Sequence, residues 1–153
     1  LEKHNIIIFQ HPLFWYSTPS ILKEWQDIVL EHQFAYGRGG DHLKDKHFFH
    51  VISMGAGIEQ YKNGTLSDTD FNDLFTPTRL MARLTKMHWH PPFVVDGVIQ
   101  HDISSNRLDY VCEEYRRVLI AMRDGFFDFA MLDKASHINT IVNKAIKNPE
   151  EIA

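Results

Sequence analysis

Three short apolar runs, separated by longer amphipathic stretches, set the hydrophobic pattern of the chain. The runs cover Ile6 to Gln10, His47 to Met54 and Phe93 to Val95, and Pro91-Pro92 is expected to set the start of the third. Strands that are apolar at consecutive positions are typical of parallel sheets, where both faces of a strand are buried. Helical periodicity follows each run, so the pattern predicts an α/β fold with an open parallel sheet.

A helix is predicted shortly after the first run. Thr18 is expected to cap its amino terminus, and Pro19 is expected at the first helical position, where a proline loses no available hydrogen bond. Apolar positions at three- and four-residue spacing form one face, which we expect to pack inward. These positions are Ile21, Leu22, Trp25, Ile28 and Val29.

Two further helices are expected. One begins at Thr76-Pro77, and the other is long, capped by Ser104 or Ser105 and ended by Gly125. The inward positions of the shorter helix are Leu80, Met81, Leu84 and Met87. The apolar stripe of the longer helix consists of Leu108, Val111, Cys112, Tyr115, Leu119 and Met122. Because Cys112 lies on this stripe, we interpret it as a small core residue rather than a nucleophile.

The end of the chain, about residues 126–153, is predicted to be a helical tail that stops at Asn148-Pro149. Its apolar positions are Ile138, Ile141, Val142, Ala145 and Ile146. Periodicity does not tell whether this tail packs on its own subunit or on a partner. Because the chain has no internal repeat and no linker, we expect residues 1–153 to form a single domain.

Length, charge and cysteine content narrow the class of protein. A chain of 153 residues is long enough to bury a real core, and its net charge of −4 with interspersed signs makes nucleic acid a poor candidate partner. The single cysteine excludes an internal disulfide framework and fits a reducing compartment. No apolar run is long enough to cross a bilayer and no signal-peptide pattern opens the chain, so a cytoplasmic protein is the simplest interpretation.

The histidines raise the possibility of a metal site. There are ten of them, and His88 and His90 share one side if their segment is extended, while His47 and His50 could approach each other. No cysteine or carboxylate completes a ligand set at a recognisable spacing. We therefore predict no metal site and interpret these histidines as surface or strand-end residues.

Two loops at the ends of strands carry the candidate chemistry, since ligands of open α/β sheets bind at the carboxyl ends of the strands. The first offers aromatic walls and backbone amides, which a flat, electron-poor ring system needs, and the second offers small residues where a backbone can approach a ligand closely. The alternatives are a hydrophobic cap over the sheet and an ordinary tight turn. The residues are Pro12, Leu13, Phe14, Trp15 and Tyr16 in the first loop, and Ser53, Met54, Gly55, Ala56 and Gly57 in the second.

The first loop and its helix resemble a known family. Their prolines, tryptophans and aromatic turn are similar to those of the flavodoxin-like NAD(P)H:quinone oxidoreductases. The matching positions are Pro12, Trp15, Pro19, Leu22, Lys23, Trp25, Phe34, Ala35 and Tyr36. The sequence looks most like the bacterial branch that includes ancillary proteins of glutathione-gated potassium efflux systems. The positions that carry this closer likeness are Gln10, His11, Pro12, Tyr36, Gly37, Gly39 and Gly40, and the resemblance spans roughly Ile6 to Val98.

The resemblance implies a flavodoxin-like sheet with helices on both faces and the strand order 2-1-3-4-5. The first run corresponds to the third strand of that order, so the first two βα units of the family have no counterpart in this chain. In the family, the loop after the first strand holds the flavin phosphate. The implied cofactor is FMN, with FAD as an alternative, and the two loops named above are the implied flavin-binding residues.

The resemblance further implies reduction of quinone-like acceptors by ping-pong hydride transfer, with NAD(P)H as electron donor. Tyr61 matches the family tyrosine that faces the flavin edge, where its phenol would stabilise developing charge. Trp15, Tyr36 and Arg38 would form the substrate pocket, with Tyr36 reaching across a homodimer interface. The chain departs from the family in having no histidine soon after Tyr61, and in having Ser53-Met54 where the family has two threonines.

These departures keep a second hypothesis open. The chain could be a regulatory ancillary subunit of a potassium efflux transporter, with little or no turnover, peripheral at the inner face of the membrane. A metal-dependent hydrolase that uses the histidines is a third and weaker hypothesis.

Overall fold

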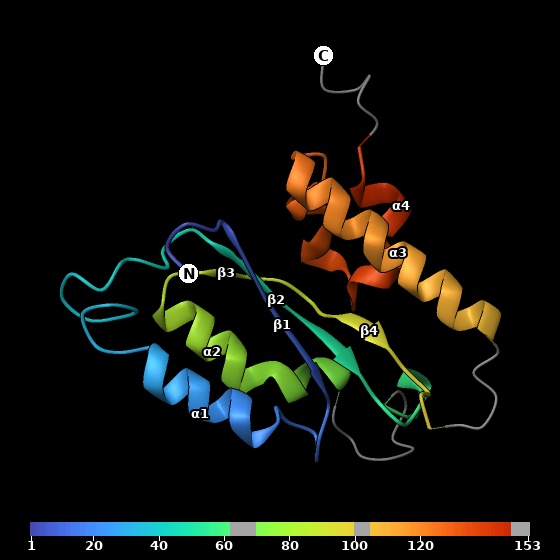
Figure 1. The fold of residues 1–153 in the computed structure, drawn as a ribbon, viewed down its shortest axis with the longest axis horizontal. Coiled ribbons are helices and arrows are strands. Elements are labelled where there is room, and N and C mark those ends of the chain that lie inside the picture. The colour runs from blue at the N-terminus through green and yellow to red at the C-terminus, as the bar shows by residue number, and fades with distance from the viewer. Residues whose placement is uncertain (62–69, 100–104, 148–153) are drawn as a thin grey trace.

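The fold is known from a computed structural model, which describes residues 1–61, 70–99 and 105–147. Its centre is a parallel sheet of the strands β1 (Ile6–Pro12), β2 (His47–Ser53), β3 (His88–Trp89) and β4 (Phe93–Val95). β2 pairs with β1 on one side and with both β3 and β4 on the other (Figure 1). Within the described ranges β1 has no second strand partner, so it forms one edge of the sheet.

β3 and β4 occupy the same position in the sheet, beside β2, and a pair of prolines lies between them. His88–Trp89 pairs with the start of β2 and Phe93–Val95 pairs with its end, whereas Pro91 and Pro92 between them have no N–H to donate. The sequence predicts the second part correctly, as it does β1 and β2. β3 was missed because two residues are too few to show a strand period.

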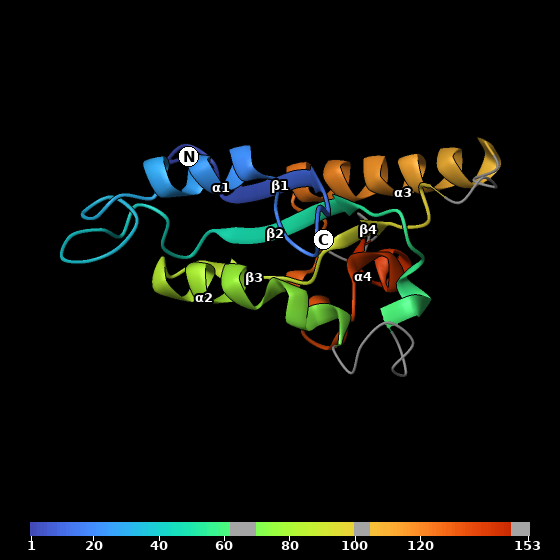
Figure 2. The same ribbon diagram turned by 90° about the horizontal axis from the view of Figure 1, so that it is seen from below.

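Helices cover both faces of this sheet. α1 (Ser20–Val29) and α2 (Thr76–Leu84) lie on one face, and α3 (Ser105–Asp124) and α4 (Val142–Ala145) lie on the other (Figure 1). In the view of Figure 2, α1 and α3 lie on the side of β1, while α2 and α4 lie on the side of β3 and β4. The arrangement confirms the predicted flavodoxin-like α/β fold with an open parallel sheet.

Alternate residues of β2 point into the two halves of the core. Phe48 packs with residues of α1 and α2, and Phe49 and Val51 pack with Val118 and Met122 of α3. His50 lies on the same face as Phe48 and is 1% exposed. An ionisable side chain therefore sits inside the layer formed by α1 and α2.

The start and the inward face of α1 differ from the prediction. The helix begins at Ser20, so Pro19 occupies the capping position and Thr18 is not the cap. Leu22 and Trp25 pack inward as expected, but Ile21 and Ile28 are 75% and 61% exposed. The periodicity predicts the apolar stripe of the helix correctly, but only one side of that stripe packs against the sheet.

The inward faces of α2 and α3 also differ from the prediction. Leu80 and Leu84 are exposed on α2, and its buried positions are Thr78 and Ala82. Cys112 is exposed, so its interpretation as a core residue is wrong. The buried side of α3 is rotated away from Cys112, and Leu108 and Leu119 are exposed along with it. The buried residues of α3 are Glu114, Val118, Ala121 and Met122.

The tail packs on its own subunit. It forms two 3-10 helices, η3 (Phe129–Lys134) and η4 (Ile138–Thr140), followed by α4, rather than one continuous helix. Ile138, Val142 and Ala145 are buried in the cluster that contains Phe49 and Phe93. The predicted stop at Asn148-Pro149 lies outside the described residues.

Candidate functional site

A strained aromatic turn forms the first wall of the site. The Phe14 N–H donates to the Ser17 carbonyl over 3.1 Å, and the Ser17 N–H donates to the Phe14 carbonyl over 2.9 Å. The two residues between them, Trp15 and Tyr16, have φ of 47° and 62°, in the left-handed region that non-glycine residues disfavour by about 1–2 kcal/mol each. Trp15 is 93% exposed. Strain that presents an aromatic side chain to solvent is typical of a ligand site.

The second loop lies beside this turn at the carboxyl end of β2. The Leu13 N–H donates to the Ser53 carbonyl over 2.8 Å, which ties the two loops together. A Cβ at Gly55 would lie 2.6 Å from Ile99 Cδ1, so a larger residue there would require the exposed Ile99 side chain to move. After this loop, the 3-10 helix η1 (Ile58–Tyr61) ends at the buried ring of Tyr61.

The two loops enclose a hollow of about 220 Å³. It is lined by Leu13, Trp15, Tyr16, Met54, Gly55, Ala56 and Tyr61. The sequence selected all of these residues, so the structure brings the two predicted loops and the predicted tyrosine together. Phe14 and Gly57 lie in the same loops but do not line the hollow, and neither do Pro12 and Ser53, which are the last residues of β1 and β2.

Tyr61 supplies the polar group of this hollow. Its ring lies edge-on to Tyr16, with ring centroids 6.4 Å apart, and edge-on to Phe71, with centroids 5.7 Å apart. Burial raises the pKa of Tyr61, and neighbouring Tyr16 raises it further. The phenol therefore stays protonated at neutral pH and can donate a hydrogen bond to an oxygen in the hollow.

Two buried histidines, His11 and His50, contact each other next to the start of the aromatic turn. This pair was not predicted from the sequence. His11 Nδ1 lies 2.9 Å from the Pro12 carbonyl, and His11 Nε2 lies 2.8 Å from His50 Nδ1. Because a carbonyl only accepts, the neutral His11 carries its proton on Nδ1, and His50 must donate from its own Nδ1. Burial lowers the pKa of His50 to about 3, and also lowers that of His11. The available signal was that His11 and His50 occupy inward positions of adjacent strands.

The other predicted substrate residues do not join Trp15 within one chain. Tyr36 lines a larger cavity of about 590 Å³ between α1 and α2, together with His11, His50 and Gln26. Arg38 is exposed in the glycine-rich turn, where Gly37 and Gly39 have φ of 83° and 81°. Neither Tyr36 nor Arg38 therefore lines the hollow that contains Trp15, and the predicted pocket of these three residues stays a prediction.

A second pair of histidines, His47 and His90, lies at the opposite end of the sheet. His47 Nδ1 lies 2.8 Å from His90 Nε2, and the His47 ring stacks on Phe129 with centroids 3.7 Å apart. The expectation that His47 approaches His50 was wrong, because residues three apart in a strand point to opposite faces. Within the described ranges, no group of three or more histidine, cysteine or acidic side chains is arranged to hold a metal ion.

Of the helices in the described part of the chain, none combines the length and the apolar character needed to cross a bilayer.

Among curated proteins, the chain is 41% identical over 101 residues to the glutathione-regulated potassium-efflux system ancillary protein KefG of Salmonella paratyphi C. The match covers 66% of this chain and 55% of that protein. The chain therefore spans only about half the length of the curated relative it matches.

Three solved structures share the fold. A thermophilic tryptophan halogenase from Streptomycin violaceusniger has a TM-score of 0.71 at 33% identity, covering 76% of this chain and 66% of that one. An NADPH-quinone reductase from P. pentosaceus has a TM-score of 0.69 at 27% identity, covering 76% and 67%. General stress protein 14 from Treponema denticola, in complex with FMN, has a TM-score of 0.62 at 26% identity, covering 73% and 66%.

The family comparison agrees with this architecture. The family model described as having a flavodoxin-like fold matches residues 1–119, which is more than half of the chain. The chain belongs to this flavodoxin-like family.

Proposed function

We propose that the chain is the main part of a flavin-dependent NAD(P)H oxidoreductase domain that reduces quinone-like acceptors. The observation that carries the proposal is the hollow between the two strand-end loops, which unites an exposed aromatic wall, a glycine-containing floor and a phenol donor. The NADPH-quinone reductase and the FMN-bound protein of the same fold support the choice of a flavin and of this reaction class.

The residues of the hollow fit the ring of a flavin but not its phosphate. The rings of Trp15 and Tyr16 offer stacking surface, and the floor at Gly55 and Ala56 has no large side chain. None of the residues that line the hollow is a lysine or an arginine, so the described part of the chain offers no cation there for a phosphate. The cofactor we propose is FMN, with FAD as the alternative, held in this chain mainly by its ring.

Each residue of the hollow has a definite task in this proposal. Trp15 and Tyr16 stack on one side of the ring, and the backbone from Met54 to Ala56 approaches it closely because its side chains are small or point into the core. Tyr61 donates its phenol proton to an oxygen on which negative charge develops. A bound flavin supplies hydride transfer from NAD(P)H to the acceptor in ping-pong order.

The proposal is tested by oxidation of NADPH with a soluble quinone and added FMN. Tyr61→Phe should lower kcat by about 100-fold, because removal of one preorganised donor typically has an effect of this size. Tyr110→Phe, which removes an exposed phenol on α3, should leave kcat unchanged. Absence of quinone-dependent NADPH oxidation in the unmodified protein loaded with FMN would contradict the proposal.

We also propose a homodimer that uses the layer formed by α1 and α2. These helices expose Ile21, Ile28, Leu80 and Leu84, and the cavity between them is lined by Tyr36. A second copy on this face would cover the exposed apolar residues and could deliver Tyr36 and Arg38 to the partner's hollow. The double variant Ile28→Lys/Leu84→Lys should be monomeric by light scattering, and Leu108→Lys/Leu119→Lys, on the opposite layer, should keep the oligomeric state.

The second candidate function is that of a regulatory ancillary subunit of a potassium efflux transporter. The 41% identity to an ancillary protein of such a system favours it, and a subunit of this kind would lie in the cytoplasm at the inner face of the membrane. Binding to the transporter's cytoplasmic domain, with regulation intact in Tyr61→Phe, would favour this function over turnover. Regulation that disappears in Tyr61→Phe would instead couple it to the chemistry of the hollow.

A further inference from the structure

The floor of the hollow is held from behind by the segment that follows β4. The Met54 N–H donates to the Val95 carbonyl over 3.0 Å, and the Val98 N–H donates to the Met54 carbonyl over 3.0 Å. The Gly97 N–H donates to the Ala56 carbonyl over 3.1 Å. Residues 95–98 therefore fix the backbone of the floor as far as Ala56.

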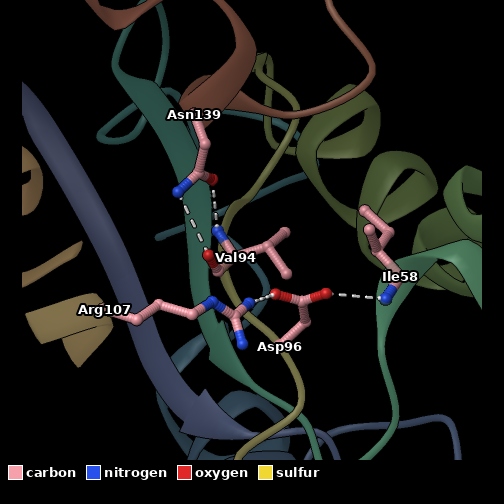
Figure 3. Close-up of polar contacts among 5 residues, drawn as sticks. All are labelled: Ile58, Val94, Asp96, Arg107 and Asn139. Atoms are coloured by element: carbon pink, nitrogen blue, oxygen red, sulfur yellow. Dashed lines mark hydrogen bonds and ion pairs between the residues drawn. The ribbon is translucent and has the colours of Figure 1, made fainter. Parts of the chain in front are cut away.

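Beyond Ala56, the Asp96 side chain holds the backbone of the loop in place. Asp96 Oδ2 accepts a hydrogen bond of 2.8 Å from the Ile58 N–H, and Asp96 Oδ1 forms an ion pair with Arg107 of α3 (Figure 3). Ile58 is the first residue of η1, and Tyr61 is the last, so the carboxylate satisfies an N–H at the start of the short helix that carries the phenol. The Asp96 side chain is only 21% exposed, which protects the bond from competition by water.

β4 itself is anchored on its far edge by the tail. Asn139 Nδ2 donates to the Val94 carbonyl over 3.1 Å, and Asn139 Oδ1 accepts from the Val94 N–H over 2.8 Å (Figure 3). The amide group thus replaces a neighbouring strand at the edge that β2 does not cover. Asp96, which follows β4 directly, is held in place by Arg107 on one side and by this anchored strand on the other.

We propose that Asp96 is a positioning residue of the candidate site. Its carboxylate fixes Ile58, and through η1 it sets the place of the Tyr61 phenol against Tyr16. The idea rests on the proposed function, because it assigns Asp96 a role in that same hollow. A bond from an N–H to a carboxylate is stronger than one to a neutral acceptor, and Arg107 fixes which oxygen faces Ile58.

The first test needs no flavin. Amide hydrogen exchange at Ile58, measured by NMR in the flavin-free protein, should become about tenfold faster in Asp96→Ala, as expected when a charge-assisted hydrogen bond is lost. Asp96→Asn keeps an acceptor oxygen and should recover part of the protection. Asp109→Asn, which removes an exposed carboxylate of α3, is the matched control and should leave the Ile58 rate unchanged. An unchanged Ile58 rate in Asp96→Ala would overturn the proposal.

The second test asks whether Asp96 acts through Tyr61. In the FMN-loaded protein, Asp96→Ala should lower kcat for quinone reduction about tenfold when Tyr61 is present, and should cause little further loss in the Tyr61→Phe background. Equal losses in both backgrounds would overturn the proposal, because Asp96 would then act independently of the phenol. If the unmodified protein shows no turnover, the proposed function fails, and the exchange measurement alone decides whether Asp96 holds the loop.

Discussion

Acidification from pH 7 to pH 5 should destabilise the fold, because His50 and His90, two of the three buried histidines in the described part of the chain, are neutral in the folded protein on opposite faces of the sheet. His50 and His90 are 1% and 7% exposed. Burial lowers the pKa of His50 to about 3, and burial together with His47 and His88 lowers that of His90 to about 4. Neither side chain therefore takes up a proton in the folded protein at pH 5.

The size of this loss of stability follows from the pKa of histidine in the unfolded chain. A histidine in an unfolded chain has a pKa of about 6.5, so acidification through this value favours the unfolded state by proton uptake. Between pH 7 and pH 5 the free energy of unfolding should fall by about 2 kcal/mol for each such histidine, or about 4 kcal/mol for the pair. This contribution is fully present above pH 6.5 and is lost as the pH falls toward the folded pKa values. Carboxylates contribute little, because they titrate mostly below this window.

Urea unfolding at pH 7, 6 and 5, followed by tryptophan fluorescence, measures the effect. His50→Gln should remove about 2 kcal/mol of the pH-dependent loss, which is the contribution of the buried His50 imidazole. His4→Gln, which removes an exposed histidine, should show the same pH dependence as the unmodified protein. The reasoning is refuted if stability is equal at pH 5 and pH 7, or if His50→Gln/His90→Gln keeps the full loss.

Three substitutions test the packing and the strain. Gly40→Ala should lower the free energy of unfolding by about 2 kcal/mol in urea titrations, because its Cβ would lie 2.1 Å from the Tyr36 carbonyl oxygen; equal stability would contradict this. Trp25→Ala should lower it by about 3 kcal/mol, because Trp25 packs edge-on against Phe9 with centroids 5.5 Å apart; a loss below about 1 kcal/mol would show that the contact is dispensable. Trp15→Gly should raise it by about 1 kcal/mol by relieving the strain at φ 47°, while weakening FMN binding in a fluorescence titration; reduced stability would exclude strain at this turn.

The sequence predicts the strands and the two site loops because their signals are local. A short continuous apolar run such as Ile6 to Phe9 is typical of a strand inside a parallel sheet, and the aromatic loop follows soon after it. Helix faces were predicted less well. Ile28 and Leu84 lie on apolar stripes, but their exposure depends on which side of each helix meets the sheet, and periodicity carries no such information.

The supports of the site could not be predicted, because they join residues that are far apart in the chain. Asp96 and Ile58 are 38 positions apart, and they belong neither to one sequence motif nor to one helix or strand. His11 and His50 are 39 positions apart and meet only because β1 and β2 pair in the observed register. Asn139 anchors Val94 from a tail whose short helices do not follow a simple period.

Flavin binding to the hollow is the central claim, and a fluorescence titration tests it most directly. Purified protein should quench the fluorescence of FMN and of riboflavin with similar affinity, because the lining residues contact the ring and offer no cation for the phosphate. Trp15→Ala/Tyr16→Ala, which removes the aromatic wall, should abolish quenching, whereas Leu108→Ala, which removes an exposed apolar side chain of α3, should preserve it. No quenching of either flavin, or equal quenching by Trp15→Ala/Tyr16→Ala, would contradict the account.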